Sequence, residues 1–247
     1  MLATLTIEGC IGTLTLNRPE ARNALSLDLL EELHARVDEV SRRSDVNVIV
    51  LTGAGKAFCA GMDLRAVLDA PSLALTLLRS LADLTLKLRA LSQVTVARVQ
   101  GAAIGGGCGL TTVCDFAITH ADSKMGFPEV DLGVCPAVVA PWLVRKLGAG
   151  RARAVLLRGG LMSGDEALAI GLVTLVTPAP TDLGPATDEL VSRLATGGPA
   201  ALAATKRLLN ELDGSLDADI VRKGAELSAR VLCTPEAQAR LRARLTG

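Results

Sequence analysis

The sequence predicts an α/β fold followed by a helical C-terminal region. In the first half one unit occurs twice, a strand followed by a glycine-rich turn and a helix, with strands expected at 46–51 and 95–99. After Pro180 the character changes, because four successive segments have the periodicity of helices. The chain has 247 residues, 49% of them hydrophobic, which is enough to bury a full core. We expect a strand-rich core over residues 1–195 and a helical lid or oligomerisation region over residues 196–247.

The chain begins with a predicted hairpin. Residues 3–7 and 11–16 alternate apolar and polar side chains on either side of Gly9, as paired strands do. A polar loop that contains Pro19 follows. A helix then begins near Ser26, with leucine and valine residues on one face and charged residues on the other.

The first glycine-rich turn follows the β-branched run at 46–51, which is typical of a strand covered on both faces. Within this turn, residues 52–65, the pair Gly55–Lys56 suggests a phosphate-binding loop. Val50 stands where that motif needs its leading glycine, so the motif is excluded. The turn ends at Asp63, which is well placed to cap the next helix.

The second glycine-rich turn lies between the strand at 95–99 and an apolar helix expected at 110–113. Four glycines remove the side chains from it: Gly105, Gly106, Gly107 and Gly109. Such a cluster lets a ligand touch the backbone and directs free N–H groups at it, or it lets a helix pack tightly on a strand. Two turns of this kind, if they faced one another, would each contribute an N–H group to one anion. Periodicity alone leaves these readings open.

The remaining elements follow from hydrophobic periodicity and capping signals. Ser163 and Glu166 form a capping box that opens a short helix. Two further strands are expected at 116–119 and 171–177, and further helices at 72–91, 136–147, 182–195, 199–212, 217–232 and 235–245.

Glu129 is the one carboxylate of interest in the second half, because the segment around it, residues 124–136, is mostly apolar. A carboxylate in such a place is either part of a structural salt bridge or a base with a raised pKa. The residues alone leave both interpretations open.

Composition and charge exclude several classes of function. The 26 basic and 26 acidic residues balance, and three Phe, one Trp and no Tyr offer few stacking platforms, so we expect no nucleic-acid partner. Two histidines are too few for a histidine metal cluster. Six cysteines without a CxxC pair indicate free thiols in a reducing cytoplasm. The N-terminus is not a signal peptide, and no uncharged stretch is long enough to span a membrane, so we expect no membrane association.

Several of these segments also match, in order, the pattern of a known family. They are residues 16–25, residues 57–64, Gly101 with Gly105 to Cys108, residues 128–133, and residues 162–173. Together they identify the chain as resembling the crotonase superfamily, the acyl-CoA enzymes typified by enoyl-CoA hydratase, over residues 3–232. Residues 133–141 further resemble the bacterial methylglutaconyl-CoA hydratase branch.

The resemblance implies a crotonase-type spiral of repeated ββα units, a C-terminal trimerisation region, and a homotrimer or dimer of trimers. It implies an acyl-CoA thioester as substrate, with no cofactor besides the coenzyme A that the substrate carries. The N–H groups of Met62 and Gly106 would form an oxyanion hole for the thioester carbonyl, and Glu129 would be the catalytic carboxylate. The implied substrate- and CoA-binding residues are Ala21, Arg22, Ala60, Met62, Asp63, Leu64, Arg65 and Gly106.

Two departures from the family pattern bear on the reaction. A hydratase normally has a second glutamate, but the matching position is Gly109, so hydration would be slow unless a group such as Asp131 substitutes. Enoyl-CoA isomerases work with a single carboxylate. The segment 234–247 lacks the Phe and Lys pattern often seen in the family, which leaves open whether it closes over CoA.

Three functions are therefore weighed. The first is hydration of a 2-enoyl-CoA, in which Glu129 moves the C2 proton. The second is isomerisation of a 3-enoyl-CoA to a 2-enoyl-CoA by Glu129 alone. The third is acyl-CoA binding without turnover. A serine hydrolase is the least favoured interpretation, because the chain has no Gly-x-Ser-x-Gly elbow and His34 and His120 are poorly placed for catalysis.

Overall fold

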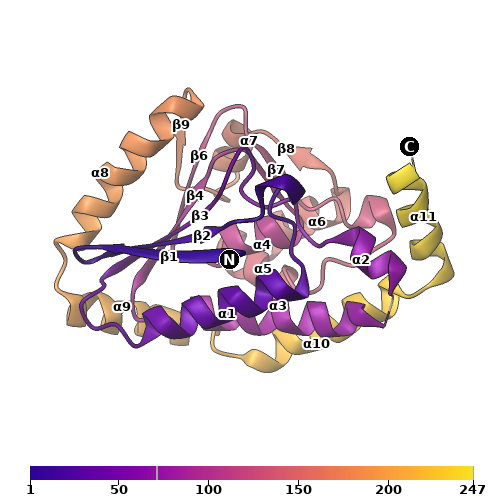
Figure 1. The fold of residues 1–247 in the computed structure, drawn as a ribbon, viewed down its shortest axis with the longest axis horizontal. Helices are drawn as coiled ribbons and strands as arrows, with labels where there is room; N and C mark the ends of the chain where they lie inside the picture. The colour runs from indigo at the N-terminus through magenta and orange to yellow at the C-terminus, as the bar shows by residue number, and fades with distance from the viewer. Residues whose placement is uncertain (71, 247) are drawn as a thin grey trace.

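The computed structural model describes residues 1–70 and 72–246 and has the α/β architecture expected from the sequence (Figure 1). The strands are β1 (Ala3–Glu8), β2 (Ile11–Leu16), β3 (Val48–Gly53), β4 (Val94–Val99), β5 (Ala102–Ile104), β6 (Phe116–His120), β7 (Lys124–Gly126), β8 (Leu161–Met162) and β9 (Leu175–Thr177). The α-helices are α1 (Leu27–Ser41), α2 (Leu64–Asp69), α3 (Leu73–Ala90), α4 (Gly106–Val113), α5 (Ala140–Leu147), α6 (Ala149–Arg158), α7 (Gly164–Ala169), α8 (Leu183–Ala195), α9 (Pro199–Leu212), α10 (Ala218–Leu232) and α11 (Pro235–Thr246). Short 3-10 helices are η1 (Pro19–Ala21), η2 (Val130–Leu132) and η3 (Pro180–Asp182).

The strands form two sheets. The larger has the order β1-β2-β3-β4-β6-β9, in which the predicted hairpin β1–β2 is antiparallel and every other pair is parallel. The smaller has the order β5-β7-β8. From β4 to β7 the chain alternates between the two sheets, because β4 and β6 belong to the larger one and β5 and β7 to the smaller one. The chain therefore winds through repeated ββα units, which confirms the predicted spiral.

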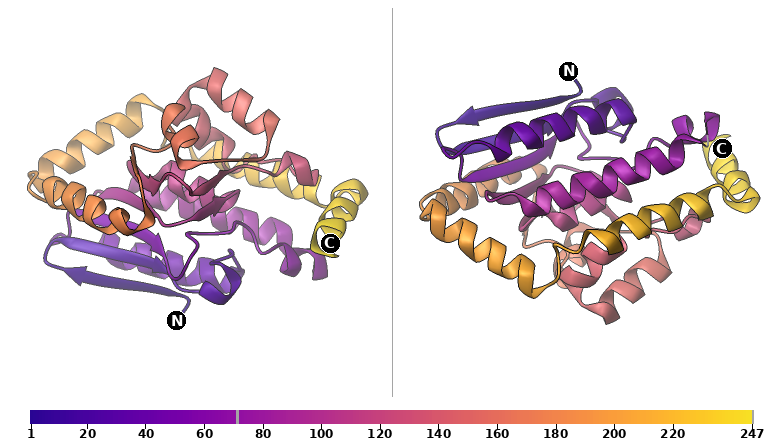
Figure 2. Two further views of the ribbon diagram at one scale, coloured as in Figure 1. Left: turned by 90° about the horizontal axis from the view of Figure 1, so that it is seen from above. Right: turned by 90° about the horizontal axis from the view of Figure 1, so that it is seen from below.

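Helices cover both faces of the larger sheet. The helix α8 packs on β3, β4 and β6, where Leu183 and Val191 meet Val48, Val96 and Ile118. On the other face α1 packs on β1 and β2, and the helices α1, α3 and α10 lie side by side (Figure 2). The β-branched run of β3 is thus buried on both sides, as its sequence predicts.

Two helix starts differ from the prediction. The helix α4 begins at Gly106 rather than at 110, so three of the four glycines lie inside it. Glycine has a low helix propensity, which hides this start in the sequence. The helix α5 begins at Ala140 rather than at 136. Residues 137–139 form a turn before it, in which the backbone N–H of Ala137 donates to Ser228 Oγ of α10. The helix α6 follows a left-handed turn at Gly148 and had no counterpart in the sequence prediction.

The helices predicted at 182–195, 199–212, 217–232 and 235–245 are confirmed as α8 to α11. Asp63 caps α2 as expected, accepting a hydrogen bond from Ala66 N–H at 3.4 Å. All six cysteines lie among the described residues, and none of them is assigned to a disulfide. Within residues 1–70 and 72–246, no helix combines the length and the apolar character needed to cross a bilayer.

Candidate active site

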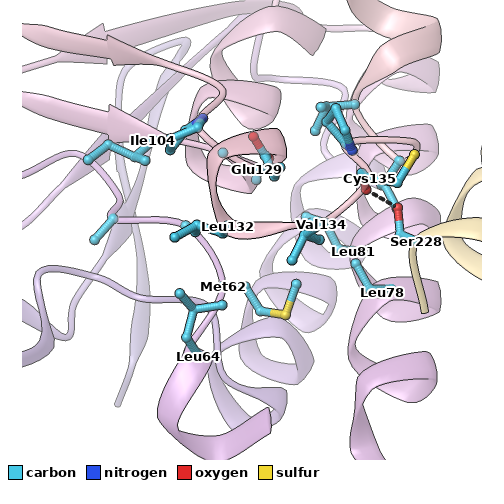
Figure 3. A pocket seen from close by; sticks show the side chains of 18 residues that line it. Met62, Leu64, Leu78, Leu81, Ile104, Glu129, Leu132, Val134, Cys135 and Ser228 are labelled. Carbon is cyan, nitrogen blue, oxygen red and sulfur yellow. Dashed lines mark hydrogen bonds between the residues drawn. The ribbon is translucent and has the colours of Figure 1, made fainter. Parts of the chain in front are cut away.

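An apolar cavity lies where the two glycine-rich turns meet, with about 640 Å³ of empty space that is partly open to solvent (Figure 3). Its wall comes from five parts of the chain: the turn before α2, the start of α4, the loop from β7 to α5, and one face each of α3 and α10. The lining residues are Ala60, Gly61, Met62, Leu64, Leu78, Leu81, Ile104, Gly105, Gly106, Pro128, Glu129, Leu132, Val134, Cys135, Pro136, Val138, Val139 and Ser228. Glu129 is the only acidic or basic residue among them.

Backbone hydrogen bonds join the two glycine-rich turns directly. Cys59 N–H donates to Ala102 O and Ile104 N–H donates to Cys59 O, both at 3.0 Å. Gly61 has a φ of 89°, and a Cβ there would lie 2.7 Å from Ile104 O and 3.8 Å from Gly106 N. The positive φ of Gly61 and its close approach to Ile104 therefore require glycine.

Two backbone N–H groups at this junction have no partner in the described part of the chain. Leu25 pairs with the neighbours of Met62, since Leu25 N–H donates to Gly61 O at 2.8 Å and Asp63 N–H donates to Leu25 O at 3.0 Å. The N–H of Met62 itself therefore points to the opposite edge. Gly106 is the first residue of α4, so its N–H has no acceptor inside the helix. Both residues line the cavity.

Gly107 allows α4 to approach the other turn closely enough to place Gly106 there. A Cβ on Gly107 would collide with Cys59 O and would lie 2.7 Å from Cys59 Cβ. The packing interpretation of the glycine cluster is thus confirmed, and the same close packing brings the N–H of Gly106 to the cavity.

Glu129 enters the same cavity from the loop after β7. Its backbone carbonyl accepts hydrogen bonds from Leu132 N–H at 3.0 Å and Val134 N–H at 2.8 Å, which hold the residue at the start of η2. A Cβ on Gly105 would lie 2.9 Å from Glu129 Oε1, so the carboxylate rests against the second glycine-rich turn. Oε2 is buried and has no hydrogen-bond partner among the described residues. The salt-bridge interpretation of Glu129 is therefore wrong.

The environment of Glu129 favours its neutral form. Burial raises the pKa of the carboxyl from 4.5 to about 7, and the nearby charge of Asp131 also raises it, while a hydrogen bond from its own backbone lowers it. A carboxylic acid with this pKa exchanges its proton readily near neutral pH, which is the property that a general acid–base group needs.

The raised pKa predicts a pH-dependent stability. The folded state keeps the Glu129 proton to about pH 7 while the unfolded chain loses it near pH 4.5, so this group lowers the free energy of unfolding as the pH rises between those values. The expected loss is up to about 3 kcal/mol. Urea denaturation of the protein and of Glu129→Gln at pH 5 and pH 8 measures it, because the glutamine variant lacks this contribution. Glu31→Gln, on the exposed face of α1, is the control, and equal pH dependence in all three proteins would contradict the assignment.

Ala21 and Arg22 lie outside the cavity but are tied to its wall. Arg22 O accepts a hydrogen bond from Ala60 N–H at 3.0 Å, and the Arg22 side chain is exposed. Asn23 holds this loop in place, because its buried amide donates to the carbonyls of Ala54, Ala57 and Phe58, at 3.0, 2.9 and 3.2 Å, and its Oδ1 accepts from the N–H of Arg18.

The residues from Asp63 to Arg65 have separate surroundings. The Asp63 carboxylate pairs with Arg18 Nη1 at 2.8 Å and caps α2, so it serves the local structure. Leu64 lines the cavity, whereas Arg65 is exposed and, like Arg22, has no ion-pair partner among the described residues.

Asp131 is not brought into the cavity. Its side chain is exposed, and Oδ2 accepts a hydrogen bond from Gly160 N–H at 2.8 Å. Asp131 therefore does not line the cavity with Glu129, although its negative charge contributes to the raised pKa of Glu129.

Sequence reasoning missed several wall residues, namely Leu78, Leu81, Val138, Val139 and Ser228. Ser228 Oγ donates to Cys135 O at 2.7 Å and so fastens the loop before α5 to α10 (Figure 3). Val139 occupies the space beside Gly109, since a Cβ on Gly109 would collide with its Cγ1 and lie 3.3 Å from its Cβ. Nothing in the local sequence signals these contacts, because each joins segments far apart in the chain.

The chain is similar to known proteins over most of its length. Residues 6–240 match the family model described as enoyl-CoA hydratase/isomerase. A short-chain-enoyl-CoA hydratase of Clostridium acetobutylicum is 33% identical over 206 residues, covering 82% of this chain and 78% of the relative. A 2,3-dehydroadipyl-CoA hydratase of Escherichia coli is 35% identical over 199 residues, covering 80% and 77%. The crystal structure of an enoyl-CoA hydratase from Bacillus halodurans superimposes with a TM-score of 0.90 at 25% identity, covering 98% of this chain and 100% of the other.

Proposed function

The chain belongs to the enoyl-CoA hydratase/isomerase family, and from this premise we propose that it adds water across the C2=C3 double bond of a 2-enoyl-CoA. The observation that carries the proposal is a shared cavity. The unpartnered carboxylate oxygen of Glu129 and the unbonded N–H groups of Met62 and Gly106 belong to residues of one apolar wall. Such a site provides a proton carrier and two hydrogen-bond donors away from bulk water.

In the proposed reaction the thioester oxygen lies between the N–H groups of Met62 and Gly106. When the oxygen of water bonds to C3, the electrons of the double bond move toward the thioester and an enolate develops. Two fixed N–H donors stabilise that charge, and each donor is worth about 3–4 kcal/mol in a dry site. The N-terminal end of α4 adds a favourable partial charge.

Glu129 would carry the proton in both directions. As a carboxylate it takes a proton from the attacking water, and as a carboxylic acid it delivers that proton to C2, so the enzyme ends in its starting state. A pKa of about 7 suits both half-steps. This assignment needs no second carboxylate, which agrees with Val139 filling the space beside Gly109.

Coenzyme A would bind along the rim of the cavity. The exposed Arg22 and Arg65 are suited to its phosphates, because both are free of ion pairs in the described part of the chain. Ala21 would lie beside Arg22. The pantetheine would run along Ala60, Met62, Asp63 and Leu64, where Asp63 contributes backbone because its carboxylate is paired.

A second candidate is supported by the single carboxylate. An enoyl-CoA isomerase needs one base, which removes a proton from C2 and returns it to C4. Glu129 alone in an apolar wall fits that reaction as well.

One pair of assays distinguishes the two reactions. With crotonyl-CoA a hydratase lowers the absorbance of the conjugated thioester, whereas with a 3-enoyl-CoA an isomerase raises it. We expect the fall with crotonyl-CoA and, at most, a much slower rise with the 3-enoyl-CoA. A rise without a fall would replace hydration by isomerisation, and no change in either assay together with measurable CoA-ester binding would leave a binding protein.

We also propose that the chain forms a homotrimer or dimer of trimers in the cytoplasm, with residues 196–247 providing the contacts. Large hydrophobic side chains are exposed on α9, on α10 and between them, which supports this proposal: Leu208, Leu209, Leu212, Leu216, Ile220 and Leu227. The lack of an assigned disulfide among the six cysteines, all within the described residues, supports a reducing compartment.

A further inference from the structure

A second cavity, with about 470 Å³ of empty space, lies at the C-terminal end of α4. It shares no lining residue with the candidate active site at the N-terminal end of the same helix. Eight residues of helix, about 12 Å, separate the two ends. Its lining is polar and charged rather than apolar: Arg89, Thr112, Cys114, Asp115, Trp142, Arg145, Lys146, Asp213 and Ser215.

Both carboxylates of this cavity are already paired. Asp115 Oδ2 lies 2.7 Å from the ammonium of Lys206, and Asp115 Oδ1 lies 3.5 Å from Arg89. Asp213 pairs with the other side of the Arg89 guanidinium at 2.7 Å. The charges of Arg89 and Lys206 are therefore balanced within the chain.

Arg145 and Lys146 have no such balance. Lys146 Nζ donates to the carbonyl of Cys114 at 3.1 Å, and Arg145 Nη2 donates to the carbonyl of Gly214 at 2.7 Å, both uncharged acceptors. No carboxylate of the described residues lies within 4 Å of either cation. Burial lowers the pKa of both groups, and the aspartates near Arg145 act on it only from a greater distance.

One donor is also left over. The guanidinium of Arg145 lies over the ring of Trp142, with its Cζ 5.0 Å from the ring centroid, and both residues line the cavity. Its Nη1 is buried and has no hydrogen-bond partner among the described residues. A buried donor on a cation is costly to leave unsatisfied, so this nitrogen needs an acceptor.

We propose that this cavity binds a small oxyanion of the phosphate or carboxylate class, held by Arg145 Nη1 and the ammonium of Lys146. Two unbalanced positive charges, an unpartnered guanidinium nitrogen and adequate space meet there. The anion would tie α5 to the end of α4 and to the turn between α9 and α10, and so stabilise the fold. A buried water molecule is the competing occupant, and it would make the protein indifferent to anions.

Thermal unfolding tests the proposal, with sodium phosphate and sodium acetate titrated separately at ionic strength held constant with sodium chloride. We expect a saturable rise in Tm of about 2–4 °C with at least one of the two anions. The responding anion identifies the class. A rise that is linear and does not saturate, or no rise with either anion, would overturn the proposal.

Variants locate the effect. The double variant Arg145→Gln with Lys146→Gln should lose the saturable rise, whereas Arg79→Gln with Arg222→Gln, which removes two exposed cations, should keep it. A rise that persists in the first double variant would place the anion elsewhere, for instance on the residues proposed for the CoA phosphates. If that variant does not fold, Thr112→Glu supplies a fixed carboxylate instead. It should melt higher than Thr112→Gln without added anion and should no longer respond to it; equal melting of the two would contradict the proposal.

Discussion

Replacing Glu129 with glutamine is expected to lower kcat on crotonyl-CoA by about 100- to 10,000-fold, the usual range for a positioned acid–base group. The amide keeps the shape of the side chain but neither accepts the proton of water nor delivers one to C2. Binding of the acyl-CoA should change little, because the carboxyl is not among the groups proposed to hold CoA. Steady-state kinetics, with substrate affinity measured separately by calorimetry, checks both parts.

The control for this prediction is Glu31→Gln, because Glu31 is an exposed residue of α1 that does not line the cavity, and this variant should leave kcat unchanged. Retention of full activity in Glu129→Gln would sink the proposed mechanism. If the unsubstituted protein and Glu129→Gln bind a CoA ester equally well and neither turns it over, the binding-protein alternative would be supported instead.

Replacing Gly107 with alanine is expected to lower kcat by about 100- to 1,000-fold, although Gly107 itself carries no functional group. The new methyl group would collide with Cys59 O and so push the start of α4 away from the first glycine-rich turn. Gly106 N–H would then move away from Met62 N–H, and the loss of one donor to the developing oxyanion costs a factor of this size. Because that interaction is strongest in the transition state, kcat should fall far more than KM rises.

Gly150→Ala is the matched control, because a Cβ at Gly150 in α6 meets nothing within 4 Å. It should leave kcat unchanged and keep or slightly raise Tm, since alanine favours a helix over glycine. The alanine at 107 should also lower Tm through overpacking. A lower Tm with an unchanged kcat in Gly107→Ala would show that the start of α4 takes no part in the reaction.

Local patterns in the sequence were sufficient for much of the fold. The hairpin β1–β2, the doubly covered strand β3 and the capped start of α2 all follow from periodicity and single capping residues. The same patterns failed at α4, whose glycines weaken a helix in isolation but leave room for close packing, of Gly107 against Cys59 and of Gly109 against Val139. They also failed at the start of α5, where residues 137–139 form a turn. A hydrogen bond from Ala137 N–H to Ser228 Oγ, 91 residues further along the chain, fastens this turn to α10.

The amino-acid sequence was enough to establish the α/β class, the helical C-terminal region, the two glycine-rich turns and Glu129 as a carboxylate in apolar surroundings. It left open whether Glu129 was paired, whether Asp131 stood beside it and what filled the space at Gly109. The tertiary structure decides all three. Among the described residues Glu129 Oε2 has no hydrogen-bond partner, Asp131 accepts a hydrogen bond from Gly160 N–H, and Val139 fills the space beside Gly109. The physical reason is that periodicity and capping act over a few residues, whereas desolvation and steric contact depend on segments that meet only when the chain is packed.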